Sequence, residues 1–398
     1  MKLFYYHQIT LLLIFVVYLN FSCHSDVEKD GINPTHTVLL DINNESSRLL
    51  ESSDIVHLDI IVPTTDDEFI LDNFDKILFR DRRIFIKPHN RGQLFVFSHE
   101  GEGLTIIDRL GAGPGEYLHL TDFDVDSVNQ QIIILDAGNR KILHYSYAGE
   151  LISEKSLDLY IKLLKAYYHN DAINYIVDLG ASSLLPGQNT AYSINLFTHD
   201  WEFVRGYFEF SKPQVGMIGK ASMLFNKSGK ATGYYKPFTD AIYHFKGDRM
   251  FQAYRLKFPL PVLPYDIFEE DPYGNYSTDK YVYNIMYDEN DAFLYLKYLQ
   301  QDQSYFIMYN KIQNAIQHYR YPHIRGDCTM LIFQNILALH HSSLVIQIAP
   351  TELECVREFF GPVLSDSQIQ ILDQMEENDN NILLLVKLGG DYAIQSPK

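Results

Sequence analysis

The sequence predicts an all-β protein, a six-bladed β-propeller of four-stranded antiparallel blades that closes by pairing its N- and C-terminal strands. Short runs rich in Ile, Val, Leu, Tyr and Phe alternate with turn residues, which is typical of many short strands. Two such units carry Asn-Arg pairs at residues 90–91 and 139–140, 49 residues apart and within the range of one blade. A segment with three glycines and one proline in five positions, residues 111–115, connects the two units.

The N-terminus predicts export. Residues 9–19 are an uncharged apolar run of 11 residues, too short to cross a bilayer but suited to a signal peptide. Ser22 directly before Cys23 resembles a bacterial lipoprotein cleavage box. We therefore expect a signal peptide (1–22), a lipidated Cys23 at the start of a flexible tether (23–52), and a propeller domain (53–390). The alternative is a plain secretory signal with an incidental cysteine.

The repeat units follow one another along the chain. Their predicted strands are 84–86 and 94–97; 132–135 and 142–145; 174–177, 193–197 and 203–204; 241–245 and 250–256; 293–299, 305–309 and 316–319; and 331–339, 344–348 and 382–388. Between the last two strands, residues 365–377 space apolar side chains three apart and predict a short helix. An extra alternating strand at 55–61 has no partner in its own unit. We expect it to pair with 382–388 and close the ring, because an open stack would expose strand edges.

The Gly-rich segment is interpreted as a structural loop formed by Gly111, Gly113, Pro114 and Gly115. A phosphate-binding loop would need a glycine where Glu116 stands, and Pro114 has no N–H to donate. We expect Gly113 or Gly115 to adopt backbone angles that alanine avoids.

Three acids at every second position, Asp122, Asp124 and Asp126, resemble the start of a calcium loop. Ser127 and Ile133 occupy positions where that loop requires glycine and glutamate. We expect solvated acids at the entry of a strand, with bound Ca²⁺ as the alternative. No other cofactor is expected.

The remaining motifs give weaker signals. His340 and His341 should point to opposite faces of a strand, so the pair should not chelate one ion. Cys328 and Cys355 are the cysteines left after Cys23, and the sequence leaves open whether they form a disulfide.

The charge pattern limits the classes of partner. A formal net charge of −18 without a Lys/Arg cluster argues against nucleic-acid binding. Arg109, Glu116, Tyr117 and Arg140 combine charge and aromatic surface near inter-blade loops, and they are candidates for a ligand-binding rim. The alternative is that they form salt bridges and packing contacts between blades.

Several phrases of the sequence resemble the six-bladed, NHL-like β-propeller lipoproteins of Bacteroidetes-type bacteria. They are Phe-Asp-Lys-Ile at 74–77, Leu-Phe-Val-Phe at 94–97, residues 110–117, Asp-Phe-Asp-Val-Asp at 122–126, residues 238–243, and Asn-Asp-Asn-Asn at 378–381. The resemblance covers about residues 53–388. It implies a propeller anchored by lipid in the cell envelope, as an outer-membrane lipoprotein on the periplasmic or outer surface, without naming a reaction.

Two classes of function follow. The first is a binding or scaffold module, expected to be monomeric, for a protein, peptide or glycan partner. The alternative is an NHL-like, metal-dependent hydrolase or lyase that uses the central channel. No catalytic residue is assigned, because distances between blades cannot be read from a sequence.

Overall fold

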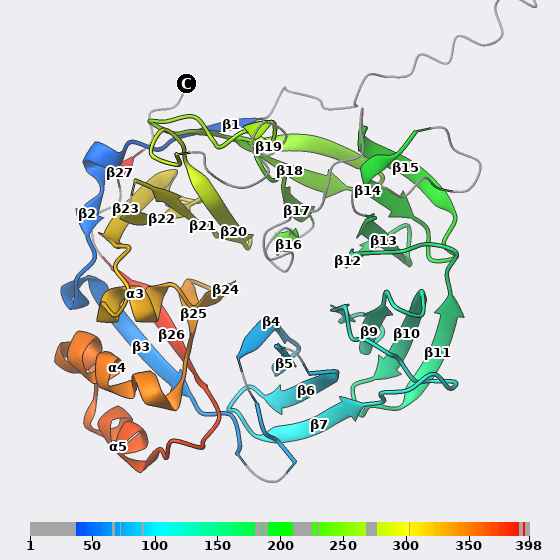
Figure 1. Cartoon of the computed structure of the whole chain (residues 1–398), viewed down its shortest axis with the longest axis horizontal. Coiled ribbons are helices and arrows are strands. Elements are labelled where there is room, and N and C mark those ends of the chain that lie inside the picture. The colour runs from blue at the N-terminus through cyan, green and yellow to red at the C-terminus, as the bar shows by residue number, and fades with distance from the viewer. Residues whose placement is uncertain are drawn as a thin grey trace, which may run out of the picture. The chain divides into compact units, whose positions relative to one another are not determined.

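The computed structural model describes residues 37–65, 68–71, 73–89, 91–179, 185, 190–209, 225–228, 231–267, 277–301, 303–389 and 393–394. The expected signal peptide and Cys23 lie outside these residues. The described residues form six sheets arranged around one axis, each with four antiparallel strands, which is the predicted six-bladed propeller (Figure 1).

The first three blades each consist of four consecutive strands. Blade one contains β4 (Phe74–Arg80), β5 (Arg83–Pro88), β6 (Gln93–Ser98) and β7 (Gly103–Asp108). Blade two contains β8 (Asp122–Asp126), β9 (Gln131–Asp136), β10 (Lys141–Ser146) and β11 (Leu151–Ser156). Blade three contains β12 (Leu163–His169), β13 (Ala172–Asp178), β14 (Tyr192–Phe197) and β15 (Phe203–Glu209).

Blades four and five follow the same order. Blade four contains β16 (Phe225–Ser228), β17 (Ala231–Tyr235), β18 (Ala241–Lys246) and β19 (Arg249–Lys257). Blade five contains β20 (Tyr283–Glu289), β21 (Phe293–Gln300), β22 (Gln303–Asn310) and β23 (Ala315–Pro322), with the short β27 (Ala393–Ile394) paired to β23.

Packing between blades explains why the middle strands are almost continuously apolar. A sheet inside the ring has a neighbour on each face, so both sets of alternating side chains are buried. Ile132, Ile133 and Ile134 of β9 are all completely buried. Ile132 and Ile134 pack toward Phe85 of blade one, whereas Ile133 packs with Tyr175 of blade three.

The sixth blade closes the ring as predicted. It contains β24 (Ile336–His340), β25 (Ser343–Ile348), β26 (Ile382–Leu388) and, as its outermost strand, β3 (Ile55–Ile61). β3 pairs antiparallel with β26, with Ile60 opposite Leu384. The first and last long strands of the propeller are therefore hydrogen-bonded to each other.

The flexible tether is predicted to extend to residue 52, but the chain is already part of the sheets from β1 (Val38–Asp41) onward. β1 pairs in parallel with the outer strand β19, and β2 (Arg48–Leu49) pairs in parallel with β23. Arg48 also forms an ion pair of 2.6 Å with Asp54. From residue 37 onward, the described chain runs along the outer edges of blades four to six and belongs to the propeller (Figure 1).

Three helices accompany blade six. The helices α4 (Leu353–Phe360) and α5 (Asp366–Gln374) lie on its outer side, whereas α3 (Cys328–Phe333) contacts β23 and β25 (Figure 1). Short 3₁₀ turns occur at Asn44–Ser46, Ser52–Asp54, Pro350–Glu352 and Gly361–Val363. The helix expected within 365–377 is confirmed as α5, whose first turn is held by a capping box between Ser365 and Gln368. The strand expected at 331–339 is wrong in its first part, because α3 occupies it. Cys328 and Cys355 form a disulfide that joins α3 to α4.

The Gly-rich loop has the expected backbone. Gly115 has φ of +72°, a region that L-residues with a Cβ rarely adopt. Its N–H donates to Glu154 Oε2 at 2.6 Å, and its carbonyl accepts from the Tyr145 hydroxyl at 2.7 Å. These two contacts fix the loop against blade two. None of the helices in the described ranges is long and apolar enough to cross a membrane.

Candidate functional site

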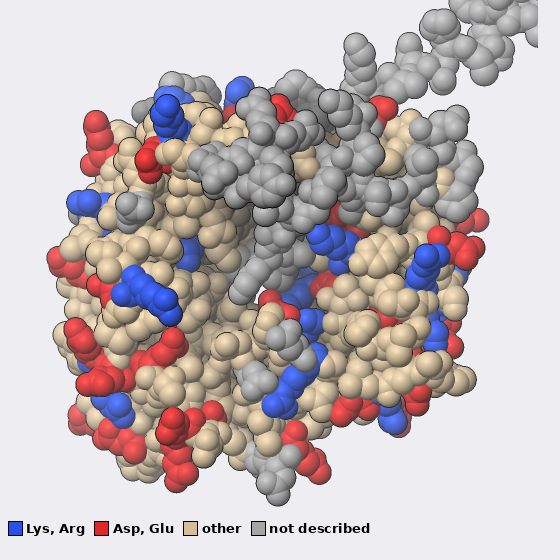
Figure 2. All heavy atoms as spheres, viewed as in Figure 1, with Lys and Arg blue, Asp and Glu red and all other residues tan. Residues whose placement is uncertain are grey.

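A cavity of about 500 Å³ lies in the central channel. Its lining comes from the inner strands β4, β12, β20 and β24 and from the turns that follow β20 and β24. Figure 2 shows Lys and Arg atoms gathered in the hollow at the centre of this face. A cavity of this volume is suited to a small molecule or the end of a chain.

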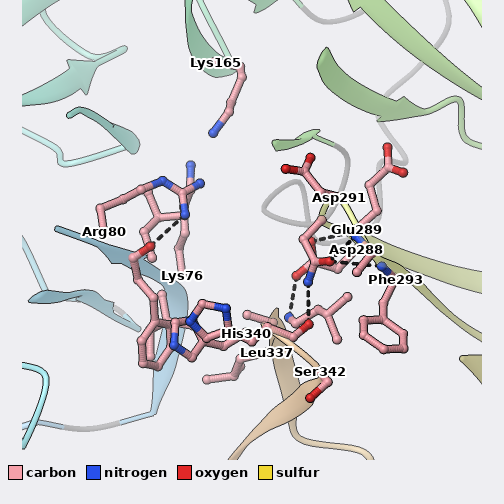
Figure 3. A pocket seen from close by; sticks show the side chains of 18 of the residues that line it. Lys76, Arg80, Lys165, Asp288, Glu289, Asp291, Phe293, Leu337, His340 and Ser342 are labelled. Carbon is pink, nitrogen blue, oxygen red and sulfur yellow. Dashed lines mark hydrogen bonds between the residues drawn. The ribbon is translucent and has the colours of Figure 1, made fainter. Parts of the chain in front are cut away.

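One wall of the cavity is cationic. Lys76 and Arg80 come from β4, where every second side chain faces the same side of the strand, and Lys165 comes from β12 (Figure 3). Lys76 pairs with Asp122 at 2.7 Å, and Lys165 pairs with Asp124 at 3.1 Å. Arg80 donates to the carbonyl of Phe79 at 2.7 Å and forms no ion pair with the described residues.

The acids of β8 are buried, which corrects the expectation that they are solvated. Asp122, Asp124 and Asp126 are only 5%, 1% and 5% exposed. Asp122 and Asp124 also accept backbone N–H groups of β12, from Leu164 at 3.0 Å and Ala166 at 2.8 Å. The cations that neutralise these two acids are therefore lysines of neighbouring blades.

Asp126 has a local role, because its carboxylate accepts from the N–H of Val128 at 2.9 Å and from the Asn129 side chain at 2.6 Å. This is a turn-forming contact of the Asx type. In the part of the chain that the structure describes, no group of three or more His, Cys, Asp or Glu side chains is arranged to hold a metal ion.

Burial shifts the pKa values of the paired groups. Desolvation lowers the pKa of Lys165 to about 8, helped by the charges of Arg80 and Lys76 and opposed by Asp124. Burial alone would raise the pKa of Asp124, but the charges of Lys165 and Lys76 outweigh it and hold that pKa below its usual value. Both members of this pair are ionised at neutral pH.

The opposite wall of the cavity is acidic and is formed by the end of β20 (Figure 3). Asp288 accepts one backbone N–H on each oxygen, from Glu289 at 2.7 Å and from Leu339 at 2.6 Å. Burial raises its pKa to about 7, despite these hydrogen bonds and the charge of Arg80. Asp291, exposed in the following turn, extends this wall.

Glu289 is fully satisfied inside the protein. Its carboxylate accepts from His244, from the Tyr287 hydroxyl, and from Lys311 Nζ at 2.5 Å. Burial would raise its pKa, but His244 and Lys311 outweigh burial and lower it. Because His244 belongs to blade four and Lys311 to blade five, this network joins two blades and leaves Glu289 little capacity for a ligand.

The histidine pair lies at the edge of the same cavity, and its predicted geometry is wrong. His341 is in the turn after β24 with φ of +53°, so its ring lies 4.2 Å from that of His340. His340 ends β24, and its ring stacks on that of Phe79, the residue before Arg80 on β4, with ring centroids 4.3 Å apart. Burial, together with the nearby His341, His99 and Arg80, lowers the pKa of His340 to about 4, so it is neutral at pH 7.

The residues predicted to form a ligand-binding rim lie elsewhere. Tyr117 is completely buried, with its hydroxyl donating to the Ile107 carbonyl at 2.9 Å, so it presents no surface to a ligand. Glu116 accepts from the N–H of Gly113 at 2.8 Å and stabilises the loop. Arg109 and Arg140 are exposed. None of these four predicted residues lines the central cavity, and a second binding surface at Arg109, Glu116 and Arg140 stays a prediction.

The comparisons with known proteins identify the family. The model of a family described as a domain of unknown function, DUF4934, matches residues 37–387. The chain belongs to the DUF4934 family. The match begins at the residue where the described part of the structure begins and ends within β26, so it covers the whole ring from β1 onward.

Two solved structures share the fold of this DUF4934 chain. One is a candidate exported protein from Bacteroides fragilis, with a TM-score of 0.72 and 19% identity over 89% of this chain and 100% of the other. The second is a DUF4221 family member from Bacteroides vulgatus, with a TM-score of 0.53 and 10% identity over 84% of this chain and 99% of the other. Among curated proteins, none matches the chain. At these identities the two structures support the propeller fold alone.

Proposed function

We propose that this DUF4934 protein is an exported, lipid-anchored binding module whose central cavity takes part of a peptide, protein or glycan partner. The observation that carries the proposal is a concave site in which charged side chains of blades one, three and five converge on one space. Internal ion pairs neutralise some of these charges, but Arg80 and Asp288 line the cavity without an ion-pair partner among the described residues, and such groups are costly unless a ligand or solvent satisfies them.

The proposed cellular location rests on the N-terminal sequence. The apolar run of residues 9–19 followed by Ser22 and Cys23 supports export and lipidation, as does the resemblance to NHL-like lipoproteins. The Bacteroides fragilis relative with the same fold is named as a candidate exported protein, which agrees with this proposal. Changing Cys23→Ala should move the protein from the membrane fraction to the soluble envelope fraction. Membrane association that survives both the substitution and a high-salt wash would exclude the lipid anchor.

The binding role is tested by blocking the cavity. Ser342 lines the cavity from the turn after β24, so Ser342→Trp should fill part of the space without removing a charge. Ala148→Trp, in an exposed turn of blade two, is the matched control. A panel of oligosaccharides and peptides is screened by thermal unfolding, where a ligand at 100 times its Kd adds about 2.7 kcal/mol of stability.

The expected result is a ligand that stabilises the wild type and Ala148→Trp but not Ser342→Trp. Equal stabilisation of all three proteins would place binding outside the channel and overturn the proposal. The alternative function, an enzyme working in the channel, predicts that the ligand that binds is also converted to product during the assay.

A further inference from the structure

We propose that the central cavity recognises a zwitterion, an amino acid or a short peptide with free ends, with its carboxylate against Arg80 and its ammonium group against Asp288. This inference rests on the proposed binding function and names the chemistry of its ligand. It follows from which charges around the cavity are already paired and which are not.

The cationic wall has three positively charged side chains but only two acids that form ion pairs with them. Lys76 and Lys165 have Asp122 and Asp124 as ion-pair partners, whereas Arg80 has none among the described residues. The guanidinium group has five N–H donors, and the Phe79 carbonyl accepts from one nitrogen. Arg80 therefore keeps a planar set of donors that suits a carboxylate, which it can bind through two parallel hydrogen bonds.

On the acidic wall, the acids are also incompletely used. Each oxygen of Asp288 accepts one backbone N–H, so each retains one acceptor position. No described cation forms an ion pair with Asp288 or Asp291, whereas the neighbouring Glu289 is fully paired. Asp75 and Glu289, the other acids that line the cavity, have ion-pair partners within the protein, so Asp288 and Asp291 are the acids left for a ligand.

The two walls together select the ligand. Figure 3 shows Lys76, Arg80 and Lys165 on one side of the cavity and Asp288, Glu289 and Asp291 on the other. A simple anion would be attracted by Arg80 but repelled by the acids on the opposite wall. A simple cation would be attracted by those acids but repelled by the cationic wall. A molecule with one charge of each sign satisfies both walls at once. The cavity volume of about 500 Å³ is large enough for an amino acid or a few residues of peptide.

The test uses calorimetric titration with trialanine, its C-terminal amide, its N-acetyl derivative, and the peptide blocked at both ends. Trialanine should bind most tightly, and removing either charge should weaken binding about 10- to 100-fold, as loss of a charged hydrogen bond does. Alanine and dialanine, titrated in parallel, distinguish a free amino acid from a peptide as the natural source of the zwitterion.

Two variants assign each end of the ligand. Arg80→Met should remove the difference between trialanine and its amide but keep the difference between trialanine and the N-acetyl derivative. Asp288→Asn should do the opposite. Arg82→Met is the matched control, because Arg82 is 84% exposed, does not line the cavity, and should leave all affinities unchanged. Arg80→Gln, which keeps hydrogen-bond donors without the charge, replaces Arg80→Met if that variant unfolds.

The outcomes separate the two proposals. Equal affinity for all four peptides, or an N-acetyl derivative that binds as tightly as trialanine, overturns the zwitterion assignment. If no peptide or alanine binds at millimolar concentration but a glycan binds in a way that Ser342→Trp abolishes, the zwitterion assignment fails and the binding function stands. If nothing binds in a manner sensitive to Ser342→Trp, both fail.

Discussion

Replacing Gly115 by alanine tests whether the Gly-rich loop is a strained joint between blades one and two. Gly115 has φ of +72°, and a Cβ there would lie 2.8 Å from Leu151 Cδ2. The hydrogen bonds of its N–H to Glu154 and of its carbonyl to Tyr145 hold the peptide in place, so the backbone cannot easily rotate away.

The expected cost has two parts. Left-handed backbone angles cost a residue with a Cβ about 1–2 kcal/mol. The contact with Leu151 adds little, because that side chain is 44% exposed and its end can move. We therefore expect Gly115→Ala to reduce the free energy of unfolding by about 1–2 kcal/mol.

Two other glycines separate strain from crowding. Gly326 has φ of +88° with nothing within 4 Å of an added Cβ, so Gly326→Ala should show the backbone cost alone, about 1–2 kcal/mol. Gly361 ends α4 with φ of −45° and is equally uncrowded, so Gly361→Ala should be neutral or stabilising by up to about 1 kcal/mol. Urea unfolding of the three variants gives the free energies. If Gly115→Ala is as stable as Gly361→Ala, the loop is not strained and the reasoning fails.

Three further predictions concern closure, the disulfide and the cavity. Deleting 382–388 should abolish hydrogen-exchange protection in all six blades, and protection retained in blades one and two would contradict ring closure. Changing both Cys328 and Cys355 to serine should cost about 3.5 kcal/mol for a loop of this length and expose the α3–α4 region to proteolysis first; unchanged proteolysis would contradict a stabilising role. Burial raises the pKa of Asp288 from 3.8 to about 7, so the folded protein binds the proton of this carboxyl group more tightly than the unfolded chain does. The contribution of Asp288 to stability is therefore present below pH 4 and is lost as the pH rises through 7. Asp288→Asn should thus stabilise the protein at pH 8 by at most about 4 kcal/mol and change little at pH 4; equal effects at the two pH values would contradict the shift.

Ring closure can be predicted from the sequence because it follows from the alternating apolar pattern of the strands and from one strand that has no partner in its own unit. The strand at 55–61 alternates, has no partner in its own unit, and lies at the opposite end of the chain from 382–388. The error at 331–339 has a physical cause. Leu331, Ile332 and Phe333 are an apolar run too short to distinguish helix from strand, and the deciding feature is Asp327, whose side chain caps α3 by accepting from the Met330 N–H. β1 and β2 cannot be predicted from the sequence, because strands of four and two residues have almost no pattern of their own.

The cationic wall of the cavity is harder to predict, because the ion pairs of Lys76 and Lys165 join residues of different blades. Lys76 and Asp122 are 46 positions apart, and Lys165 and Asp124 are 41 apart, so no local spacing links them. The sequence did contain a signal: Asp122, Asp124 and Asp126 share one face of a strand, and that face requires positive charge from somewhere. For Asp122 and Asp124, lysines on the inner strands of the adjacent blades supply it. Once a propeller is recognised, charged residues within the first strand of a unit, such as Lys76, Lys165 or Asp288, become candidates for the channel, because the first strand of each blade lies nearest the axis. The acids of β8 are the exception, because they are buried against the lysines of neighbouring blades. Applied to β4, the same rule places Arg80 beside Lys76 on one face of the strand. The acids of β8 already neutralise Lys76 and Lys165, so Arg80 is the cation left for a ligand.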